Sequence, residues 1–301
     1  MQKHFYDVII IGGSYAGLSA AMVLGRSLRD VLVIDSGEPC NRQTPHSHNF
    51  LTQDGKTPAE ISALARQQVE QYETVQFLNG LASKGRKVEG GFEMDTRDGE
   101  AVRAKKLMFA TGVKDLMPDI KGFSECWGIS VIHCPYCHGY ENRSKLTGIM
   151  TKGEHATHFV PLIFNLSKDV VFFTQGKHDV DPDFLKKMKQ KGIEIIESSI
   201  SEIVHQDGYM REVILKAGKK VKLDALYAPV PFEQSTDIPA SLGCELTEQG
   251  LLKVDMLNAT TVPGVYACGD SIIQFRAVAQ AVSSGNIAGA ALNRELAMEA
   301  F

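Results

Sequence analysis

The stretch DVIIIGGSYAGL, residues 7–18, constrains the fold of this 301-residue chain more than any other. An apolar run with the length of a buried strand leads directly into a glycine turn. Gly12 and Gly17 occupy the first and third glycine positions of a dinucleotide-binding turn, and Ser14 occupies the second. Taken alone, a glycine motif with one substitution is weak, so its meaning depends on the residues after it.

The next residues have the order of a dinucleotide-binding unit. A helix over Leu18–Leu28 comes first, and then an apolar strand over Val31–Asp35. Asp35 lies at the distance where an acid contacts a ribose hydroxyl in such folds. Because strand, turn, helix, strand and acid arrive in order, the segment predicts a Rossmann-like nucleotide site.

The same pattern returns 139 residues later in degraded form. Strands over 146–150 and 170–174 flank the second copy, and the four key positions Gly12, Ser14, Gly17 and Asp35 become Thr151, Gly153, Ala156 and Thr174. Thr151 adds a β-carbon at the tight turn, where one is poorly tolerated. The strand ending at Thr174 offers neither an acid for a ribose nor an arginine for a 2′-phosphate. We therefore expect an α/β protein with two such folds, the second with little or no nucleotide binding.

Further elements are indicated between and after these units. Thr57, Pro58 and Glu60 form a capping box that predicts a helix to about Tyr72, and Asp181-Pro182 predicts a short helix through Lys191. Asp98-Gly99 predicts a hairpin between strands over 92–96 and 101–106, and a strand over 106–110 then runs into Thr111-Gly112.

Composition excludes several functions. The net charge is −4 with 23% charged residues, so no polyanion-binding surface is indicated, and we expect no nucleic acid partner. The opening MQKHFYDVIIIGG has one lysine and an apolar run too short for a membrane helix, with no cleavage site. We expect a cytoplasmic protein with no membrane association.

The cysteine pattern centres on Cys134-Pro-Tyr-Cys137-His138. The other four cysteines, Cys40, Cys126, Cys244 and Cys268, are scattered, and we interpret them as small buried residues. The spacing matches c-type haem attachment, but that chemistry requires export, so haem is set aside. Zinc stays an alternative through His133, Cys134, Cys137 and His138, although these adjacent ligands would crowd one ion and the usual second ligand pair is absent. A redox disulfide is favoured, because two intervening residues let the sulfurs reach disulfide geometry.

His138 follows the redox pair directly and titrates near neutrality, so it is predicted to be the acid and base of thiol exchange. For His133 the structural role is favoured over the catalytic one. Tyr136 and Trp127, the single tryptophan, are interpreted as packing residues.

The stretch Thr261–Asp270, TVPGVYACGD, is a strand that ends in Gly269-Asp270, and a helix rich in small residues follows through Ala291. Together with Gly12–Gly17 and Ala110-Thr111-Gly112, it closely resembles the low-molecular-weight thioredoxin reductase family of FAD enzymes. The resemblance spans essentially the whole chain. It implies an FAD domain over 1–114 and 233–301, and an inserted NAD(P)-type domain over 115–232 that carries the redox pair.

The resemblance also implies site residues. The catalytic set is Cys134, Cys137 and His138, with Cys137 as the cysteine that faces the flavin and no metal. Asp270 would bond the ribitol chain, Asp35 the adenosine ribose, and the segment 276–278 would lie beside the isoalloxazine. The full FAD-binding set is Gly12, Gly13, Ser14, Ala16, Gly17, Asp35, Thr111, Gly112, Gly269, Asp270, Arg276, Ala277 and Val278.

Three departures from the family pattern narrow the function. His138 stands where ordinary thioredoxin reductases often have aspartate, the second glycine motif is degraded, and the basic residues that hold NADPH are missing. These features resemble the family's dithiol-oxidase branch, which closes disulfides in gliotoxin- and holomycin-type metabolites, or another NADPH-independent branch such as the ferredoxin-linked enzymes. Expected substrates are a small dithiol or disulfide, or a thioredoxin-like protein, and the resemblance suggests a homodimer. An NADPH-dependent thioredoxin reductase and a non-catalytic FAD-bound redox sensor are the alternatives.

Overall fold

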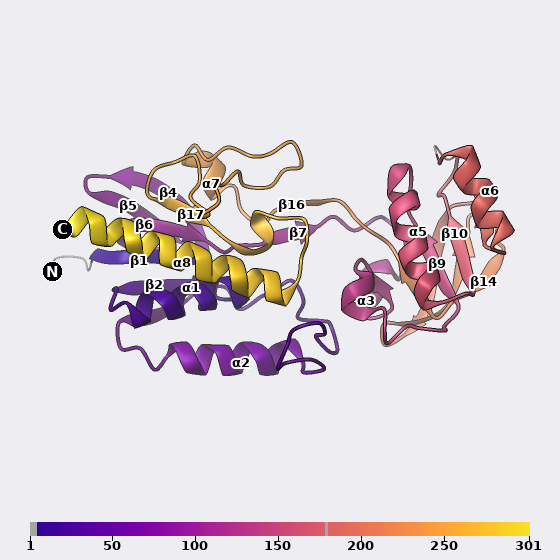
Figure 1. Ribbon diagram of the computed structural model, residues 1–301, viewed down its shortest axis with the longest axis horizontal. Coiled ribbons are helices and arrows are strands. Elements are labelled where there is room, and N and C mark those ends of the chain that lie inside the picture. The colour runs from indigo at the N-terminus through magenta and orange to yellow at the C-terminus, as the bar shows by residue number, and fades with distance from the viewer. Residues whose placement is uncertain (1–4, 178–179) are drawn as a thin grey trace. The chain divides into compact units, whose positions relative to one another are not determined.

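In the computed structural model, which describes residues 5–177 and 180–301, the chain separates into two units (Figure 1). Unit 1 contains residues 5–42, 49–114 and 232–301. Unit 2 contains residues 43–48 and the described part of 115–231. The chain thus leaves unit 1 twice and returns to it twice.

The short segment 43–48 is the main difference from the expected division, in which 1–114 belonged to one domain; residue 232 also lies in unit 1 rather than at the end of the insert. Thr44 and Ser47 in this segment are buried. A β-carbon on Gly128 would lie 3.0 Å from Thr44 Oγ1, and His48 Nε2 lies 3.6 Å from Glu141 Oε1. These contacts attach the segment to unit 2. No motif in the sequence of residues 43–48 predicts them.

Unit 1 is built on a seven-stranded sheet within the described residues, in the order β3-β2-β1-β6-β5-β4, with β17 paired to β6. Parallel pairing joins β3, β2, β1, β6 and β17, whereas β4, β5 and β6 pair antiparallel. The strands are β1 (Phe5–Ile11), β2 (Val31–Asp35), β3 (Val75–Asn79), β4 (Ala82–Val88), β5 (Gly91–Thr96), β6 (Ala101–Phe109) and β17 (Val265–Ala267).

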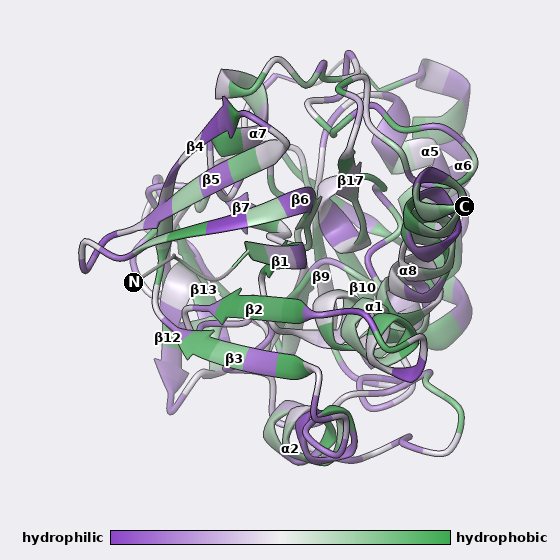
Figure 2. Ribbon diagram, turned by 90° about the vertical axis from the view of Figure 1, so that its left-hand side faces the viewer, coloured by the Kyte–Doolittle hydropathy of each residue, from purple (hydrophilic) through white to green (hydrophobic). Residues whose placement is uncertain are grey.

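Both faces of the parallel strands are covered, which explains their continuous apolar sequences. Along β1, Val8 and Ile10 join one buried cluster, and Ile9 and Ile11 join the other. Figure 2 shows β2 as a mainly hydrophobic strand in the same sheet. The helices of this unit are α1 (Tyr15–Arg26), α2 (Pro58–Val69), α7 (Ile238–Ser241), the 3₁₀ turn η1 (Gly269–Ser271) and α8 (Val278–Ala300).

Helix α8 lies alongside α1 (Figure 1), and glycines make this contact close. A β-carbon on Gly285 would lie 2.1 Å from the Ala16 carbonyl oxygen, and one on Gly289 would lie 3.0 Å from that of Ala20. Only residues without a side chain permit this approach. The small-residue composition of the C-terminal helix therefore serves its packing onto the first helix.

Unit 2 repeats the plan of the first sheet. Its five parallel strands, counted within the described residues, run in the order β11-β10-β9-β15-β8. They are β8 (Val131–Ile132), β9 (Thr147–Met150), β10 (Val170–Phe173), β11 (Glu194–Ile196) and β15 (Ala225–Tyr227). In each unit the first strand of the motif, β1 or β9, stands between the second strand and one from later in the chain. The prediction of an α/β chain with two Rossmann-like folds is confirmed.

The remaining elements complete the description. An antiparallel sheet contains β12 (Ile200–Gln206), β13 (Tyr209–Leu215) and β14 (Lys220–Lys222), and β7 (Val113–Asp115) pairs with β16 (Phe232–Gln234). The other helices are α3 (Phe123–Cys126), α4 (Pro135–His138), α5 (Glu154–Leu166) and α6 (Pro182–Gln190). None of the helices within residues 5–177 and 180–301 combines the length and apolar character needed to cross a bilayer.

Local predictions from the sequence agree with these elements. The capping box at α2 is formed, because Glu60 N donates to Thr57 Oγ1 and Thr57 N donates to the Glu60 carboxylate. The hairpin around Asp98-Gly99 is present as β5 and β6. The last helix, expected to run through Ala291, continues to Ala300.

An ion-pair network around one buried lysine holds the extra turns of α8. Lys106 on β6 contacts the carboxylates of Glu295 and Glu299, and Tyr266 Oη donates to Glu295 at 2.6 Å. The side chain of Lys106 is 9% exposed, so it depends on these carboxylates for compensation of its charge. Hydrogen bonds and charge from Lys106 and Tyr266 lower the pKa of Glu295 against the opposing effect of burial.

We expect Lys106→Met to lower the free energy of unfolding at pH 7 by about 1–3 kcal/mol, because it leaves Glu295 without its cation. Since the pKa of Glu295 is lowered on folding, the contribution of the pair is present above the unfolded pKa of a glutamate and is lost as pH falls through the folded value. Urea unfolding at pH 7 and pH 3 measures both effects. Lys84→Met, at an exposed position of β4, is the control. Equal stability of the two variants at pH 7 would contradict the prediction.

Candidate active site

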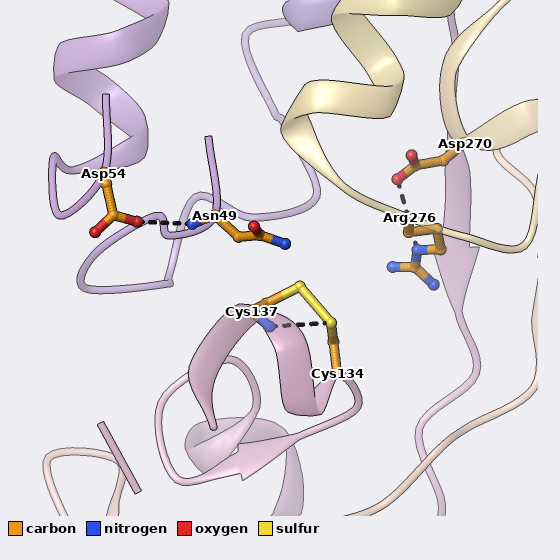
Figure 3. Close-up of a disulfide and its surroundings, with 6 residues drawn as sticks. All are labelled: Asn49, Asp54, Cys134, Cys137, Asp270 and Arg276. Carbon is orange, nitrogen blue, oxygen red and sulfur yellow. Dashed lines mark hydrogen bonds and ion pairs between the residues drawn. A yellow bond between two sulfur atoms is a disulfide. The ribbon is translucent and has the colours of Figure 1, made fainter. Parts of the chain in front are cut away.

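The two cysteines of the redox motif stand at the start of helix α4, immediately after β8. Cys134 caps this helix, with its Sγ accepting a hydrogen bond from Cys137 N at 3.2 Å, and Pro135 occupies the first helical turn. The structure joins Cys134 and Cys137 in a disulfide with 5.4 Å between their Cα atoms (Figure 3). The predicted pairing is confirmed, and its geometry comes from one helical turn.

The remaining cysteines are free thiols, as expected from their scatter. Burial raises the pKa of the Cys126 thiol to about 11 and that of Cys268 to about 12, and it also raises the pKa of Cys244. These three thiols stay protonated and are poor nucleophiles at neutral pH. Cys40 differs from the expectation, because it is exposed, with its Sγ 3.9 Å from Asp270 Oδ2.

His138 ends α4 and is half-buried. Burial lowers its pKa first, a nearby charge on His48 lowers it further, and Glu141 acts in the opposite direction. A histidine whose pKa is lowered is neutral at pH 7 and is available as a base. The turn that carries it is fixed by Asn142, whose Nδ2 donates to the His138 carbonyl at 2.9 Å.

The aromatic residues near the motif have different roles. Trp127 is buried and stacks on Phe123 and on His133, with ring centroids 5.8 Å and 5.6 Å apart. The structural interpretation of Trp127 and His133 fits these contacts. Tyr136 was interpreted as a packing residue, but it is 56% exposed, because its place between the cysteines on a one-turn helix turns it toward solvent. Tyr140 is also exposed, with the Arg143 guanidinium 3.9 Å from its ring centroid.

The glycine turn between β1 and α1 in unit 1 leaves no room for side chains. A β-carbon on Gly12, whose φ is +102°, would lie 2.3 Å from the Ala110 carbonyl oxygen, and one on Gly17 would lie 1.9 Å from the Gly12 carbonyl oxygen. A β-carbon on Gly13 would lie 2.8 Å from Asp35 Cβ. Gly13 N donates to Asp35 Oδ1 at 3.0 Å. The turn thus presents bare backbone next to an acid at the end of β2, which is what a dinucleotide needs.

A second part of the same site comes from the C-terminal end of the chain. The acidic residue Asp270 lies 3.5 Å from Arg276, measured from Oδ2 to Nε (Figure 3). Gly269, with φ +78°, approaches Ala16, since a β-carbon on it would lie 3.0 Å from Ala16 Cβ. Gly269 N donates to Ser284 Oγ at 2.9 Å. Residues from both ends of the sequence are therefore brought together in unit 1.

The remaining residues predicted to bind the cofactor also belong to unit 1. Gly112 has φ +64°, and the hydroxyl of Thr111 is buried without a hydrogen-bond partner. Ser14 caps α1 and Ala277 caps α8 without a side-chain hydrogen bond, and Val278 opens α8, whose first turn holds no acidic residue. An unpartnered buried hydroxyl and two helix starts without side-chain caps fit an acceptor-rich ligand such as FAD.

Sequence reasoning missed several supporting residues. Ser284 holds the Gly269 backbone, and Asn258 Nδ2 donates to the Ser284 carbonyl at 2.9 Å. Gln234 Nε2 donates to the carbonyls of Gly250 and Ser271. These contacts join distant segments, and no local spacing indicates them.

The equivalent turn in unit 2 has a different shape. Ala156 occupies the third glycine position with a fully buried methyl group, whereas the first turn would place such a methyl group 1.9 Å from an oxygen. Thr174 is buried, and its Oγ1 donates to the Gly176 carbonyl at 2.6 Å, so it faces its own loop. Glu154, which no sequence motif singled out, puts a carboxylate in the first turn of α5. That carboxylate would repel a pyrophosphate at the start of the helix.

Within residues 5–177 and 180–301, no group of three histidine, cysteine, aspartate or glutamate side chains is arranged to hold a metal ion. Lys152 and Lys177, which lie close in the sequence to Thr151 and Thr174, are exposed, and His178 lies outside the described residues.

Comparison with known proteins gives consistent results. The family model for pyridine nucleotide-disulphide oxidoreductases matches residues 6–152 and 166–285. The chain is 32% identical to "Thioredoxin reductase tcpT" of Claviceps purpurea over 98% of this chain and 95% of that protein. Among solved structures, an oxidoreductase from Agrobacterium tumefaciens is 37% identical with a TM-score of 0.91, covering 98% and 99% of the two chains. A putative thioredoxin reductase TrxB from Bacillus anthracis is 29% identical with a TM-score of 0.94, covering 99% and 100%.

The geometry of unit 1 predicts the effect of removing Asp270. We expect Asp270→Ala to weaken FAD affinity about 10- to 100-fold, since a hydrogen bond to a charged group contributes about 1.5–3 kcal/mol. Equilibrium dialysis with the apoprotein measures this affinity. Asp98→Ala, in an exposed hairpin turn, is the control. An Asp270→Ala variant that retains the flavin as tightly as this control would rule out the assigned contact.

Proposed function

This chain belongs to the pyridine nucleotide-disulphide oxidoreductase family, among its thioredoxin reductase-like enzymes of low molecular weight, and from that premise we propose that it is an FAD-dependent dithiol oxidase that works without NADPH. The observation that carries the proposal is a contrast between the two units. Unit 1 keeps the bare glycine turn and its acid, Asp35, whereas the corresponding turn of unit 2 has filled its third glycine position and added Glu154.

The residues proposed to bind FAD are those gathered in unit 1. The turn over Gly12–Gly17 takes the pyrophosphate, Asp35 the adenosine ribose and Asp270 the ribitol chain. Thr111, Gly112 and the segment 276–278 complete the site. When bound, FAD accepts two electrons from the cysteine pair and returns them to oxygen or another external acceptor.

The cysteines and His138 carry out the thiol chemistry. His138 takes the proton of a substrate thiol, and the thiolate attacks the Cys134–Cys137 disulfide, so one sulfur–sulfur bond forms as another breaks. A second substrate thiolate attacks the mixed disulfide. The substrate leaves as a disulfide, and both cysteines are left reduced. Cys137, by the family resemblance, is the cysteine that passes the electron pair on.

The proposed substrates are a small dithiol or a thioredoxin-like protein. The ring of Tyr136, between the two cysteines, and that of Tyr140, in the turn after their helix, are both exposed, which supports substrate docking at this surface. The family resemblance also suggests a cytoplasmic homodimer, and light scattering of the purified holoprotein tests the dimer.

NADPH and NADH are expected to be poor reductants of the bound flavin. The glycine turn of unit 2 is altered, and the strand that ends at Thr174 is not followed by an arginine that could bind the 2′-phosphate of NADPH. Anaerobic stopped-flow mixing with excess NADPH, then with a dithiol such as dithiothreitol, follows the flavin absorbance. We expect slow bleaching by NADPH and rapid bleaching by the dithiol. Rapid bleaching by micromolar NADPH would instead support an ordinary NADPH-dependent reductase. Bleaching without steady-state consumption of dithiol would support a redox sensor.

His138→Ala is expected to slow the dithiol half-reaction by on the order of 10²-fold, because it removes the base. Since the pKa of His138 is lowered, its neutral form predominates above pH 6.5, and the wild-type rate should fall only as pH drops below that value. The variant should lose this acid limb and retain its FAD. His133→Ala, which removes a stacked histidine, is the control. Small and equal effects of the two substitutions would return His138 to a structural role.

A further inference from the structure

Two histidines and a glutamate from separate parts of unit 2 lie together beside the redox pair. His138 directly follows Cys137, Glu141 lies three residues later, and His48 comes from the segment 43–48. The rings of His48 and His138 meet edge to face, with centroids 6.5 Å apart and an interplanar angle of 88°. His48 Nε2 lies 3.6 Å from Glu141 Oε1. The fold thus places two further ionisable side chains, those of His48 and Glu141, in a cluster with His138.

The position of His48 is fixed by the packing of its segment. Thr44 and Ser47 are both buried, and Thr44 Oγ1 lies within 3.0 Å of the place where a β-carbon on Gly128 would stand. A segment of six residues that is anchored in this way holds His48 in one place. Proton transfer needs such fixed distances, since its efficiency depends on alignment of donor and acceptor.

The reaction requires a proton exit as well as a base. Each substrate thiol gives one proton to His138, and each cysteine thiolate released in the exchange takes one back. When the disulfide forms again, the two cysteine thiols lose two electrons and two protons. The electron pair would pass through FAD to the external acceptor, which takes up two protons from solvent as it is reduced, so the two protons of the cysteine thiols must leave the pair in every turnover.

We propose that His48 and Glu141 form a proton relay that carries these protons from His138 to solvent. The inference rests on the proposed dithiol oxidation. His138 takes a proton from a thiol and passes it to His48, with one water bridging the two rings. The imidazolium of His48 is stabilised by the Glu141 carboxylate, whose side chain is 38% exposed and releases the proton to water.

The charges around the cluster favour this direction of transfer. Burial lowers the pKa of His138 and a positive charge on His48 lowers it further, with Glu141 acting in the opposite direction, so His138 does not retain a proton readily. Further titratable groups face the cluster. His46 lies with its ring 6.4 Å from that of His48, and Tyr227 on β15 is buried next to the charge of Glu141. Burial raises the pKa of Tyr227, so its phenol stays protonated and takes no part in the transfer.

The test compares His48→Asn and Glu141→Gln with His155→Asn, which removes an exposed histidine of α5. Anaerobic single-turnover reduction of the holoprotein by dithiothreitol is followed from pH 5.5 to 8.5, with and without added imidazole. We expect His48→Asn to slow the reaction about tenfold at pH 7 and imidazole to restore most of the rate, because a small base replaces the missing ring. Glu141→Gln should slow it less and shift the pH profile to lower pH. Rates equal to those of His155→Asn, or a loss that imidazole does not restore, would overturn the relay.

A second readout does not depend on turnover. NMR titration of the oxidised holoprotein with labelled histidines should show the His48 and His138 transitions coupled, and His48→Asn should reduce that of His138 to a single step at higher pH. An unchanged His138 titration in this variant would overturn the relay. If the wild-type protein does not react with dithiothreitol, dihydrolipoamide or a reduced thioredoxin, the proposed function fails, and the titration still decides whether the two histidines exchange protons.

Discussion

Much of this structure depends on one steric constraint, the contact of backbone with backbone at the turn after β1. The Gly12 carbonyl lies where a Gly17 side chain would be, and the Ala110 carbonyl lies where a Gly12 side chain would be. This places the end of β6 against the start of α1. Helix α8 then reaches α1 through Gly285. Close backbone contacts at three glycines therefore join the two ends of the sequence in one unit, and they leave the turn without side chains, as the proposed binding of a pyrophosphate requires.

The degraded repeat shows what happens when that constraint is relaxed. Once Ala156 stands at the third glycine position, the helix and the turn must lie further apart to hold the methyl group. Thr174 then turns its hydroxyl to its own loop instead of to a ligand. The strand order of the sheet is unaffected, because it is determined by the apolar strands and not by the turn. A Rossmann-like unit can in this way retain its strand order while the residues at its glycine turn change.

The sequence allowed prediction of those features that depend on neighbours in the chain. Strand and helix types, the capping box at Thr57, the two related folds and the Cys134–Cys137 pair are all indicated by local patterns, and the structure agrees with them. Features that depend on contacts between distant segments were not predictable. Ser284 under Gly269, the exposure of Tyr136 and the place of His48 beside Glu141 leave no local signal, since each depends on which part of the chain packs against it.

The chain crosses between the two units four times, and this limits how the redox unit can be exchanged between proteins. In a simple insertion, the middle of the sequence could be exchanged between relatives as one cassette. Here a cassette cut at residues 115 and 231 would lack the segment 43–48 and with it the partner of Glu141. Natural or engineered recombination can therefore move the complete unit into another flavoprotein only by transferring two separate coding segments together.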